Sequence, residues 1–291
     1  MQTDVTRDFS VAAADGALLR VREFTARPGA DEAATVVLAH GWTLTHASWL
    51  PVVERLRAST GARVVVYDQR GHGASTPGPG HPSVRTLGDD LAAVLAVAAP
   101  SGPVVLGGHS MGGMSLLAYA GQHPEDFRSR VRGSVLVSTA AGELSPRRGA
   151  MEVLVMQALA RAPRLPAGRA ITLRSQQALL FGDDPRPEDV RATRDQVAAT
   201  HLPTFGRFHR ALAQHDEADA AAHFDGIPTR ILVGEKDRLT PVRLSRRLAE
   251  LMPHATLEVL PGRGHMLPYE APDVLAGALA AQLRAPQADT R

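Results

Sequence analysis

Short runs of aliphatic, mostly β-branched residues alternate with helical patterns along most of the chain. Parallel strands need long crossover connections, usually helices, so this alternation builds a mainly parallel sheet with helices on both faces. The sequence therefore predicts an α/β fold. The expected strands are residues 35–39, 62–67, 103–106, 131–137, 229–233 and 256–260.

Helical patterns fill the intervals between these runs. An opening hairpin is expected over residues 8–24, with its turn at Asp15-Gly16. One helix is expected to begin near Thr86, because Thr86 and Asp89 have the spacing of an N-cap and an N3 residue. The other expected helices are residues 47–58, 111–120, 242–251 and 272–283.

The middle of the chain interrupts this rhythm. Between about residues 141 and 225 the β signal disappears, and helical segments separated by prolines follow one another. The length of 291 residues suffices for one large domain or two small ones. Since the strand and helix pattern resumes at residue 229, we interpret the stretch as a helical insertion.

Composition excludes several kinds of site. The absence of Cys excludes disulfides, a thiolate nucleophile and a Cys-based metal site. Basic residues exceed acidic ones by only 32 to 30 and form no run, so no nucleic-acid partner is expected. Neither a secretory signal nor an apolar stretch of membrane-spanning length occurs, so a cytoplasmic protein is expected. Arginine in place of lysine, with abundant Ala, Gly and Pro, is typical of GC-rich bacterial genomes.

The sequence Gly-His-Ser-Met-Gly at 108–112 fits the pattern G-x-S-x-G. An apolar run, residues 104–106, comes directly before it, and a helical pattern, residues 114–119, follows. In this setting the flanking glycines let the chain turn so tightly that the serine hydroxyl projects above the edge of the sheet. We therefore expect Ser110 to be a nucleophile. The alternative is an ordinary serine in a glycine-rich turn.

A serine nucleophile needs a base to take its proton and an acid to orient that base. Asp237 follows the strand expected at 229–233, and His265 follows the strand that ends at Leu260. Both residues are therefore expected at carboxyl ends of strands, and the chain order Ser, Asp, His is the one expected for a nucleophile elbow. We expect His265 to be the base and Asp237 the acid, with Glu235 as the alternative acid.

Other histidines are assigned different roles, and no metal or cofactor is expected. The histidines beside the expected site are assigned to hydrogen bonds within loops: His40, His72 and His109. Two more near helix ends are expected to cap helices or face solvent: His123 and His254. Three in the insertion have spacings that do not place them on one helical face: His201, His209 and His215.

An acyl-transfer intermediate also needs N–H donors for its oxyanion. Met111 follows Ser110 at a helix N-terminus, where the backbone N–H is free and the helix dipole favours negative charge. Trp42 follows the strand expected at 35–39, and its backbone N–H is the expected second donor. A role for the Trp42 side chain as an apolar wall is compatible with this.

With these residues assembled, the chain resembles the α/β-hydrolase superfamily over nearly its whole length. The resemblance rests on His-Gly-Trp at 40–42, Asp-Gln-Arg-Gly-His-Gly at 68–73, Gly-His-Ser-Met-Gly-Gly at 108–113, Asp237 and Gly264-His265. It implies an eight-stranded sheet with a helical cap inserted after the sixth strand. The implied core is residues 1–140 and 223–291, and the implied cap is residues 141–222. Residues 68–73 are implied to form a structural loop beside the site.

Ser110 separates the chain from the epoxide hydrolases and haloalkane dehalogenases of this superfamily, which use Asp at that place. We expect a serine hydrolase that cleaves a carboxylic ester, lactone or thioester of a small apolar substrate through an acyl-enzyme. The alternatives on the same triad are perhydrolysis of the cofactor-free haloperoxidase type, carbon–carbon bond hydrolysis and acyl transfer. A non-catalytic ligand receptor is the alternative from another class.

The implied cap is expected to lie over the site and to set the size of the acyl and leaving groups. Four of its apolar residues are candidates for the pocket wall: Met156, Phe181, Phe205 and Phe208. The alternative is that these side chains form the core of the cap itself, since they recur at helical spacing.

Overall fold

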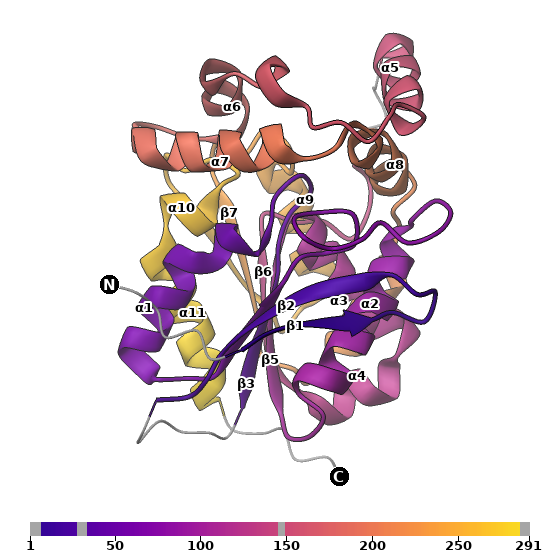
Figure 1. The fold of residues 1–291 in the computed structure, drawn as a ribbon. Coiled ribbons are helices and arrows are strands. Elements are labelled where there is room, and N and C mark those ends of the chain that lie inside the picture. The colour runs from indigo at the N-terminus through magenta and orange to yellow at the C-terminus, as the bar shows by residue number, and fades with distance from the viewer. Residues whose placement is uncertain (1–6, 28–33, 145–148, 286–291) are drawn as a thin grey trace.

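The computed structural model describes residues 7–27, 34–144 and 149–285. One eight-stranded sheet runs through it in the order β1-β2-β4-β3-β5-β6-β7-β8 (Figure 1). β2 pairs antiparallel with β1 and β4, and the other neighbours are parallel, which confirms the predicted α/β fold. The strands are β1 (Arg7–Ala12), β2 (Leu18–Phe24), β3 (Thr35–Ala39), β4 (Val64–Tyr67), β5 (Val104–His109), β6 (Val131–Val137), β7 (Thr229–Gly234) and β8 (Thr256–Leu260).

Helices connect most of the strands. They are α1 (Leu50–Thr60), α2 (Val84–Ala98), α3 (Met111–Gln122), α4 (Pro124–Arg130), α5 (Ala150–Ala160), α6 (Leu173–Leu180), α7 (Pro187–Ala199), α8 (Leu202–Ala213), α9 (Val242–Leu251), α10 (Leu267–Glu270) and α11 (Pro272–Arg284). Short 3₁₀ segments are η1 (His46–Trp49), η2 (Gly168–Ala170) and η3 (Asp219–Phe224). Within the described ranges, no helix combines the length and the apolar character needed to cross a membrane.

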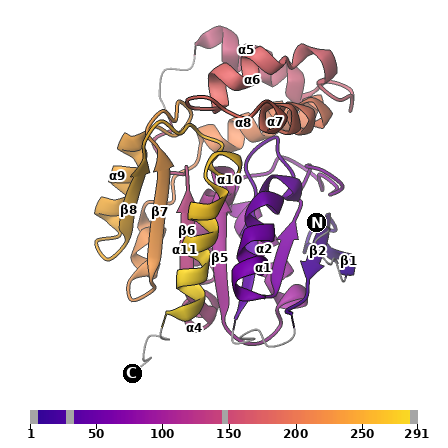
Figure 2. The same ribbon diagram turned by 90° about the vertical axis from the view of Figure 1, so that its left-hand side faces the viewer.

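Both faces of the sheet are buried under helices, which explains why the strands read as continuous apolar runs. Along β5, Val104 and Leu106 point into one hydrophobic cluster and Val105 points into another. Helices α1 and α11 cover the face of Val105, and α2, α3 and α9 pack on the opposite face (Figure 2). The core therefore consists of two layers of side chains, one on each side of the sheet.

Helix α2 begins earlier than the sequence predicts. Ser83 Oγ accepts the Thr86 N–H at 3.0 Å, and Thr86 Oγ1 accepts the Ser83 N–H at 3.1 Å. Ser83 is thus the N-cap and Thr86 the N3 residue, a reciprocal capping box one turn before the predicted one. The prediction of Thr86 as N-cap is therefore wrong, because Ser83 offers both partners of the box and brings Val84 into the core.

Helices α4 and α10 are not anticipated by the sequence analysis. Each has a proline in its first turn and is too short for a 3.6-residue periodicity to show. Helix α10 begins directly after the segment that carries His265, so it helps to fix the position of that segment.

Helices α5 to α8 lie together above the carboxyl ends of the parallel strands (Figure 1). Helix α5 packs on α8, and α6 packs on α7. The tail of the insertion behaves differently, because η3 packs against α3 and α4, where the rings of Phe224 and Phe127 have centroids 4.7 Å apart. Residues 219–222, expected in the cap, therefore lie with the helices of the core.

A buried ion pair fixes the loop that follows β4. Arg70 Nε and Nη2 each lie 2.6 Å from an oxygen of Asp90 in α2, and Arg70 Nη1 lies 2.7 Å from Asp15 in the first hairpin turn. The side chains of Arg70 and Asp90 are only 3% and 2% exposed. The loop at residues 68–73 is thus tied to two separate elements of the core.

We predict that Asp90→Asn lowers the free energy of unfolding by about 3 kcal/mol, because it leaves the buried Arg70 charge without its main partner. The control is Asp89→Asn on the same helix, whose side chain is 55% exposed and whose ion pair is expected to contribute less than about 1 kcal/mol. Urea unfolding of both variants measures the difference. Equal losses would show that the buried pair carries no special weight.

Candidate active site

Ser110 is the single residue between β5 and α3. Its φ of 53° and ψ of −118° lie outside the regions that L-residues favour. A Cβ at Gly112 would lie 2.1 Å from the Ala39 carbonyl oxygen, and a Cβ at Gly108 would lie 2.6 Å from the Gly112 carbonyl carbon. The glycines of the motif are therefore sterically required. The Ser110 N–H donates to the Val137 carbonyl at 2.9 Å and anchors the strained turn to β6.

His265 and Asp237 meet at the carboxyl ends of β7 and β8. His265 Nδ1 lies 2.8 Å from Asp237 Oδ2, which also accepts the Thr240 hydroxyl at 2.9 Å. The N–H groups of Leu239 and Thr240 donate to Asp237 Oδ1 at 2.9 and 2.8 Å. Burial raises the pKa of Asp237, but the facing imidazole and these hydrogen bonds outweigh it and hold that pKa below its usual value. The ionised carboxylate thus holds Nδ1–H and leaves Nε2 for proton transfer.

Thr240 was missed by the sequence analysis. It stands three residues after an Asp, which is the spacing at which a side chain caps a turn, and this was the available signal. The alternative acid, Glu235, is exposed and accepts the Gly262 N–H at 2.9 Å. Of the two candidate acids, it is Asp237 that contacts His265.

The two expected oxyanion donors adjoin Ser110 in different ways. Met111 is the first residue of α3, and Trp42 follows β3 and lines the same cavity as Ser110. Neither backbone N–H donates to any residue that the structure describes. The indole of Trp42 packs edge to face on Phe205, with centroids 5.9 Å apart, so the side chain also forms part of the wall.

A cavity of about 300 Å³ adjoins these groups. Ser110 and His265 both line it, and so do Gly41, Thr43, His109, Gln176 and Thr240. The rest of the lining is apolar and comes from the core and the insertion: Trp42, Leu44, Met114, Leu144, Met156, Ile171, Leu179, Leu180, Val197, Phe205, Leu212, Leu239 and Met266. The arrangement places a nucleophile and a base in a largely apolar chamber.

Two of the four expected pocket residues, Met156 and Phe205, line the cavity. Phe208 lies outside the lining, because it is on the face of α8 that meets the core, where its ring lies 4.9 Å from that of His72. Phe181 also lies outside, buried in a cluster that includes Val190. Helical spacing identified apolar faces correctly but not which of them the cavity would meet.

The histidines of the insertion are dispersed. His209 Nε2 lies 2.9 Å from Glu152 Oε1, and His215 Nε2 donates to the Ala140 carbonyl at 3.0 Å. Across the described ranges, His, Cys, Asp and Glu form no group of three or more that could hold a metal ion.

A family model for the alpha/beta hydrolase fold matches residues 34–272. The chain belongs to the α/β-hydrolase fold family. It is 29% identical over 255 residues to the non-heme chloroperoxidase CPO-A1 of Kitasatospora aureofaciens, which covers 79% of this chain and 84% of that protein. It is 26% identical over 279 residues to the bifunctional esterase/perhydrolase DCH of Acinetobacter calcoaceticus, which covers 88% and 94%. A thermophilic esterase from Thermogutta terrifontis has a similar structure, with a TM-score of 0.79 at 25% identity over 96% of this chain and 98% of that one.

In this α/β hydrolase, Glu270 fixes the loop that carries His265. Its carboxylate accepts the N–H of Gly264 at 3.0 Å and of Met266 at 3.1 Å, the residues on either side of His265. It also accepts the N–H of Gly182, in the insertion, at 2.8 Å. Sequence reasoning missed Glu270, although an acid that closes a short apolar stretch was a usable signal.

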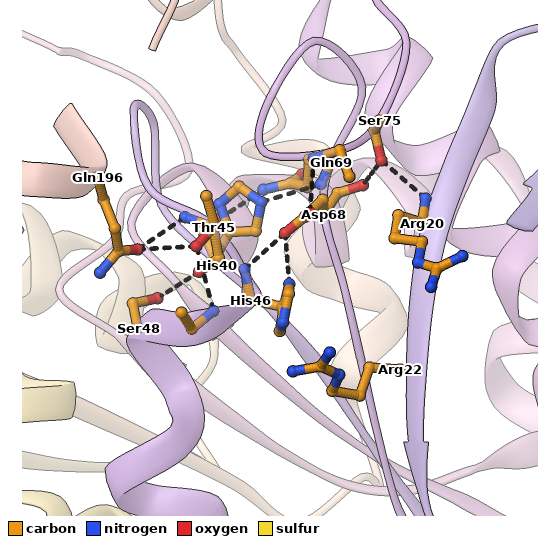
Figure 3. Close-up of polar contacts among 12 residues, drawn as sticks. Arg20, Arg22, His40, Thr45, His46, Ser48, Asp68, Gln69, Ser75 and Gln196 are labelled. Carbon is orange, nitrogen blue, oxygen red and sulfur yellow. Dashed lines mark hydrogen bonds and ion pairs between the residues drawn. The ribbon is translucent and has the colours of Figure 1, made fainter. Parts of the chain in front are cut away.

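The loop after β4 holds the segment that carries Trp42 (Figure 3). Asp68 Oδ1 accepts the backbone N–H of His46 at 2.8 Å and its ring N–H at 2.7 Å. Burial raises the pKa of Asp68, but these bonds and the nearby imidazoles outweigh it and bring that pKa to about 2. The Gln69 N–H donates to His40 Nε2 at 2.9 Å, and its side-chain amide donates to the His40 carbonyl. The position of Trp42 thus depends on this network.

Three histidines beside the site are fully buried. Burial lowers the pKa of His40 to about 4 and the pKa values of His72 and His109 to about 3. Each donates one ring N–H to a carbonyl oxygen; the acceptors are Gly41, Arg70 and His265, at 2.7, 2.9 and 2.9 Å. These neutral imidazoles hold loops in place, as the sequence analysis expected.

We predict that the free energy of unfolding falls as the pH drops from about 6.5 toward 4. In this window the unfolded chain, with His pKa values near 6.5, binds protons that the folded imidazoles do not. Each buried His contributes a slope of about 1.4 kcal/mol per pH unit near pH 5. Urea unfolding as a function of pH should therefore show a smaller slope, by about that amount, in His72→Gln. The exposed His81→Gln is the matched control, and a wild-type slope in His72→Gln would show that folded His72 is protonated.

Proposed function

We propose that this α/β hydrolase is a serine hydrolase that cleaves a carboxylic ester, lactone or thioester through an acyl-enzyme. Ser110 is the nucleophile, His265 the general base and Asp237 the acid that orients it. One observation carries the proposal: Ser110 and His265 line the same apolar cavity, while Asp237 holds the far nitrogen of the His265 ring.

The reaction follows from these positions. His265 Nε2 takes the proton of the Ser110 hydroxyl as its oxygen attacks the carbonyl carbon, and the backbone N–H groups of Trp42 and Met111 bind the resulting oxyanion. The bond to the leaving group breaks, and the leaving group takes the proton from His265. A water molecule, deprotonated by His265, then attacks the acyl-enzyme and releases the acid, which restores the Ser110 hydroxyl.

The cavity supports a small, largely apolar substrate. Its volume of about 300 Å³ is at the lower end of the range for ligand pockets, and most of its lining is aliphatic or aromatic. Water exclusion by such a lining strengthens the interactions of the oxyanion with its donors.

Perhydrolysis is a second candidate, and the relatives named a chloroperoxidase and an esterase/perhydrolase favour it. In this reaction hydrogen peroxide replaces water at the second step, attacks the same acyl-enzyme and leaves as a peracid. Ester turnover with and without hydrogen peroxide, followed by peracid detection, distinguishes the two outcomes.

We predict that a fluorophosphonate probe labels the protein at one site and that Ser110→Ala abolishes the labelling. The measurement is intact mass, alongside turnover of p-nitrophenyl acetate and p-nitrophenyl octanoate to size the acyl site. Labelling and ester turnover that both require Ser110 are the expected result. Folded protein that stays unlabelled would contradict the proposal and favour a non-catalytic receptor.

We predict that Asp237→Asn lowers kcat by about four orders of magnitude while the fold is kept, because the amide stabilises the wrong tautomer of His265. Glu235→Gln is the matched control two residues away and is expected to retain kcat within about threefold, since this exposed side chain contacts a loop N–H rather than the imidazole. Steady-state kinetics and circular dichroism on both variants test this. The opposite pattern would assign the acid role to Glu235.

A further inference from the structure

The wall that the insertion contributes to the cavity contains one polar side chain among apolar ones. Met156, Ile171, Leu180 and Phe205 are typical of this wall, and Gln176 of helix α6 interrupts it. No Lys, Arg, Asp or Glu is among the described residues that line the cavity. Gln176 is therefore an uncharged polar group in an apolar surface.

Gln176 is buried, with 7% of its surface exposed. Its backbone N–H donates to the Thr172 carbonyl at 3.2 Å within the first turn of α6, but its side-chain amide forms no hydrogen bond to any residue in the described ranges. A carboxamide has two donor hydrogens and an acceptor oxygen, and leaving such groups unpaired in a buried place is unfavourable. The side chain therefore requires a partner that the protein does not supply.

A second buried glutamine of the insertion shows the contrast. Gln196 of helix α7 accepts the backbone N–H and the hydroxyl of Thr45, each at 3.0 Å, and donates to the Tyr269 hydroxyl at 2.8 Å (Figure 3). Gln196 thus joins the insertion to the core with its side chain fully used. Gln176 has no such structural role and is directed instead at the cavity that contains Ser110.

We propose that Gln176 forms a hydrogen-bonding subsite for the substrate, at a distance from the bond that is cleaved. This inference rests on the proposed ester hydrolysis and narrows its substrate class. The backbone N–H groups of Trp42 and Met111 serve the scissile carbonyl, so the amide of Gln176 serves a second polar group. That group is uncharged, a ketone, hydroxyl or amide on an otherwise apolar acyl or alcohol chain, because the cavity offers no opposite charge to pair with an ion.

Such a subsite discriminates by the cost of leaving Gln176 unpaired. An ester that lacks the second polar group fills the cavity but leaves a buried amide without a partner, which a matching ester avoids. The matching ester should therefore have the higher kcat/KM, by about fivefold to tenfold for one hydrogen bond.

The experiment compares matched pairs of esters on wild type, Gln176→Met and Gln177→Met. One pair varies the acyl chain, p-nitrophenyl hexanoate against p-nitrophenyl 5-oxohexanoate, and the other varies the alcohol, hexyl acetate against 5-oxohexyl acetate. Gln177→Met is the matched control, because Gln177 is the exposed neighbour on the same helix. Methionine has nearly the volume of glutamine but neither its donors nor its acceptor oxygen.

Wild type and Gln177→Met are expected to favour the oxo ester of one pair about fivefold to tenfold, and Gln176→Met to lose this preference. The pair in which this happens shows whether the subsite holds the acyl or the alcohol side. Gln176→Met is expected to keep or raise the melting temperature, since it removes an unpaired buried amide. A preference that is absent from both pairs, or that survives in Gln176→Met, would overturn the subsite.

Binding measured without turnover separates this inference from the proposed function. Calorimetry of the intact esters with Ser110→Ala, alone and combined with Gln176→Met, reports the subsite even if no ester is hydrolysed. Absent turnover and labelling with a binding preference that needs Gln176 would reject the esterase and retain the subsite. Ester turnover with equal binding of both members of each pair would do the reverse.

Discussion

The close approach of helix α3 to strand β3 beneath Ser110 is the constraint on which the site depends. Gly112 meets the Ala39 carbonyl at a distance that leaves no room for a side chain. This contact sets the position of α3, and with it the backbone N–H of Met111. Ala39 is also the last residue of β3, so the segment that carries Trp42 starts at the same point. One steric requirement thus brings the strained serine turn and both proposed oxyanion donors together.

The loop that carries His265 is held by the core and by the insertion together. Asp237 and Thr240 hold its ring from the core side, and Glu270 bonds the N–H groups on either side of it. From the insertion, the Leu180 carbonyl accepts the His265 N–H at 2.8 Å, and Gly182 donates to Glu270. The insertion is therefore part of the support of the base as well as a cover for the cavity. Both roles begin in the same short segment at the end of α6.

Polar groups around the cavity are used in two distinct ways. The buried imidazoles of His40, His72 and His109 each bond a carbonyl and hold the surrounding loops, and burial keeps them neutral. The amide of Gln196 likewise joins the insertion to the core. Gln176, also buried, is left for a ligand. Rigidity on one side and an unsatisfied group on the other are what a selective site requires, since only a fixed donor can discriminate.

The sequence by itself determined the alternation of strands and helices, the glycine-flanked turn at Ser110 and the order in which an acid and a histidine follow it, because these depend on local periodicity and sterics. Tertiary structure decided which groups meet. Contact with His265 separated Asp237 from Glu235, packing on the core took Phe208 out of the cavity, and pairing with Thr45 separated Gln196 from Gln176. A sequence pattern shows that a face is buried, but the partner on that face comes from distant segments, and only the folded chain brings them together.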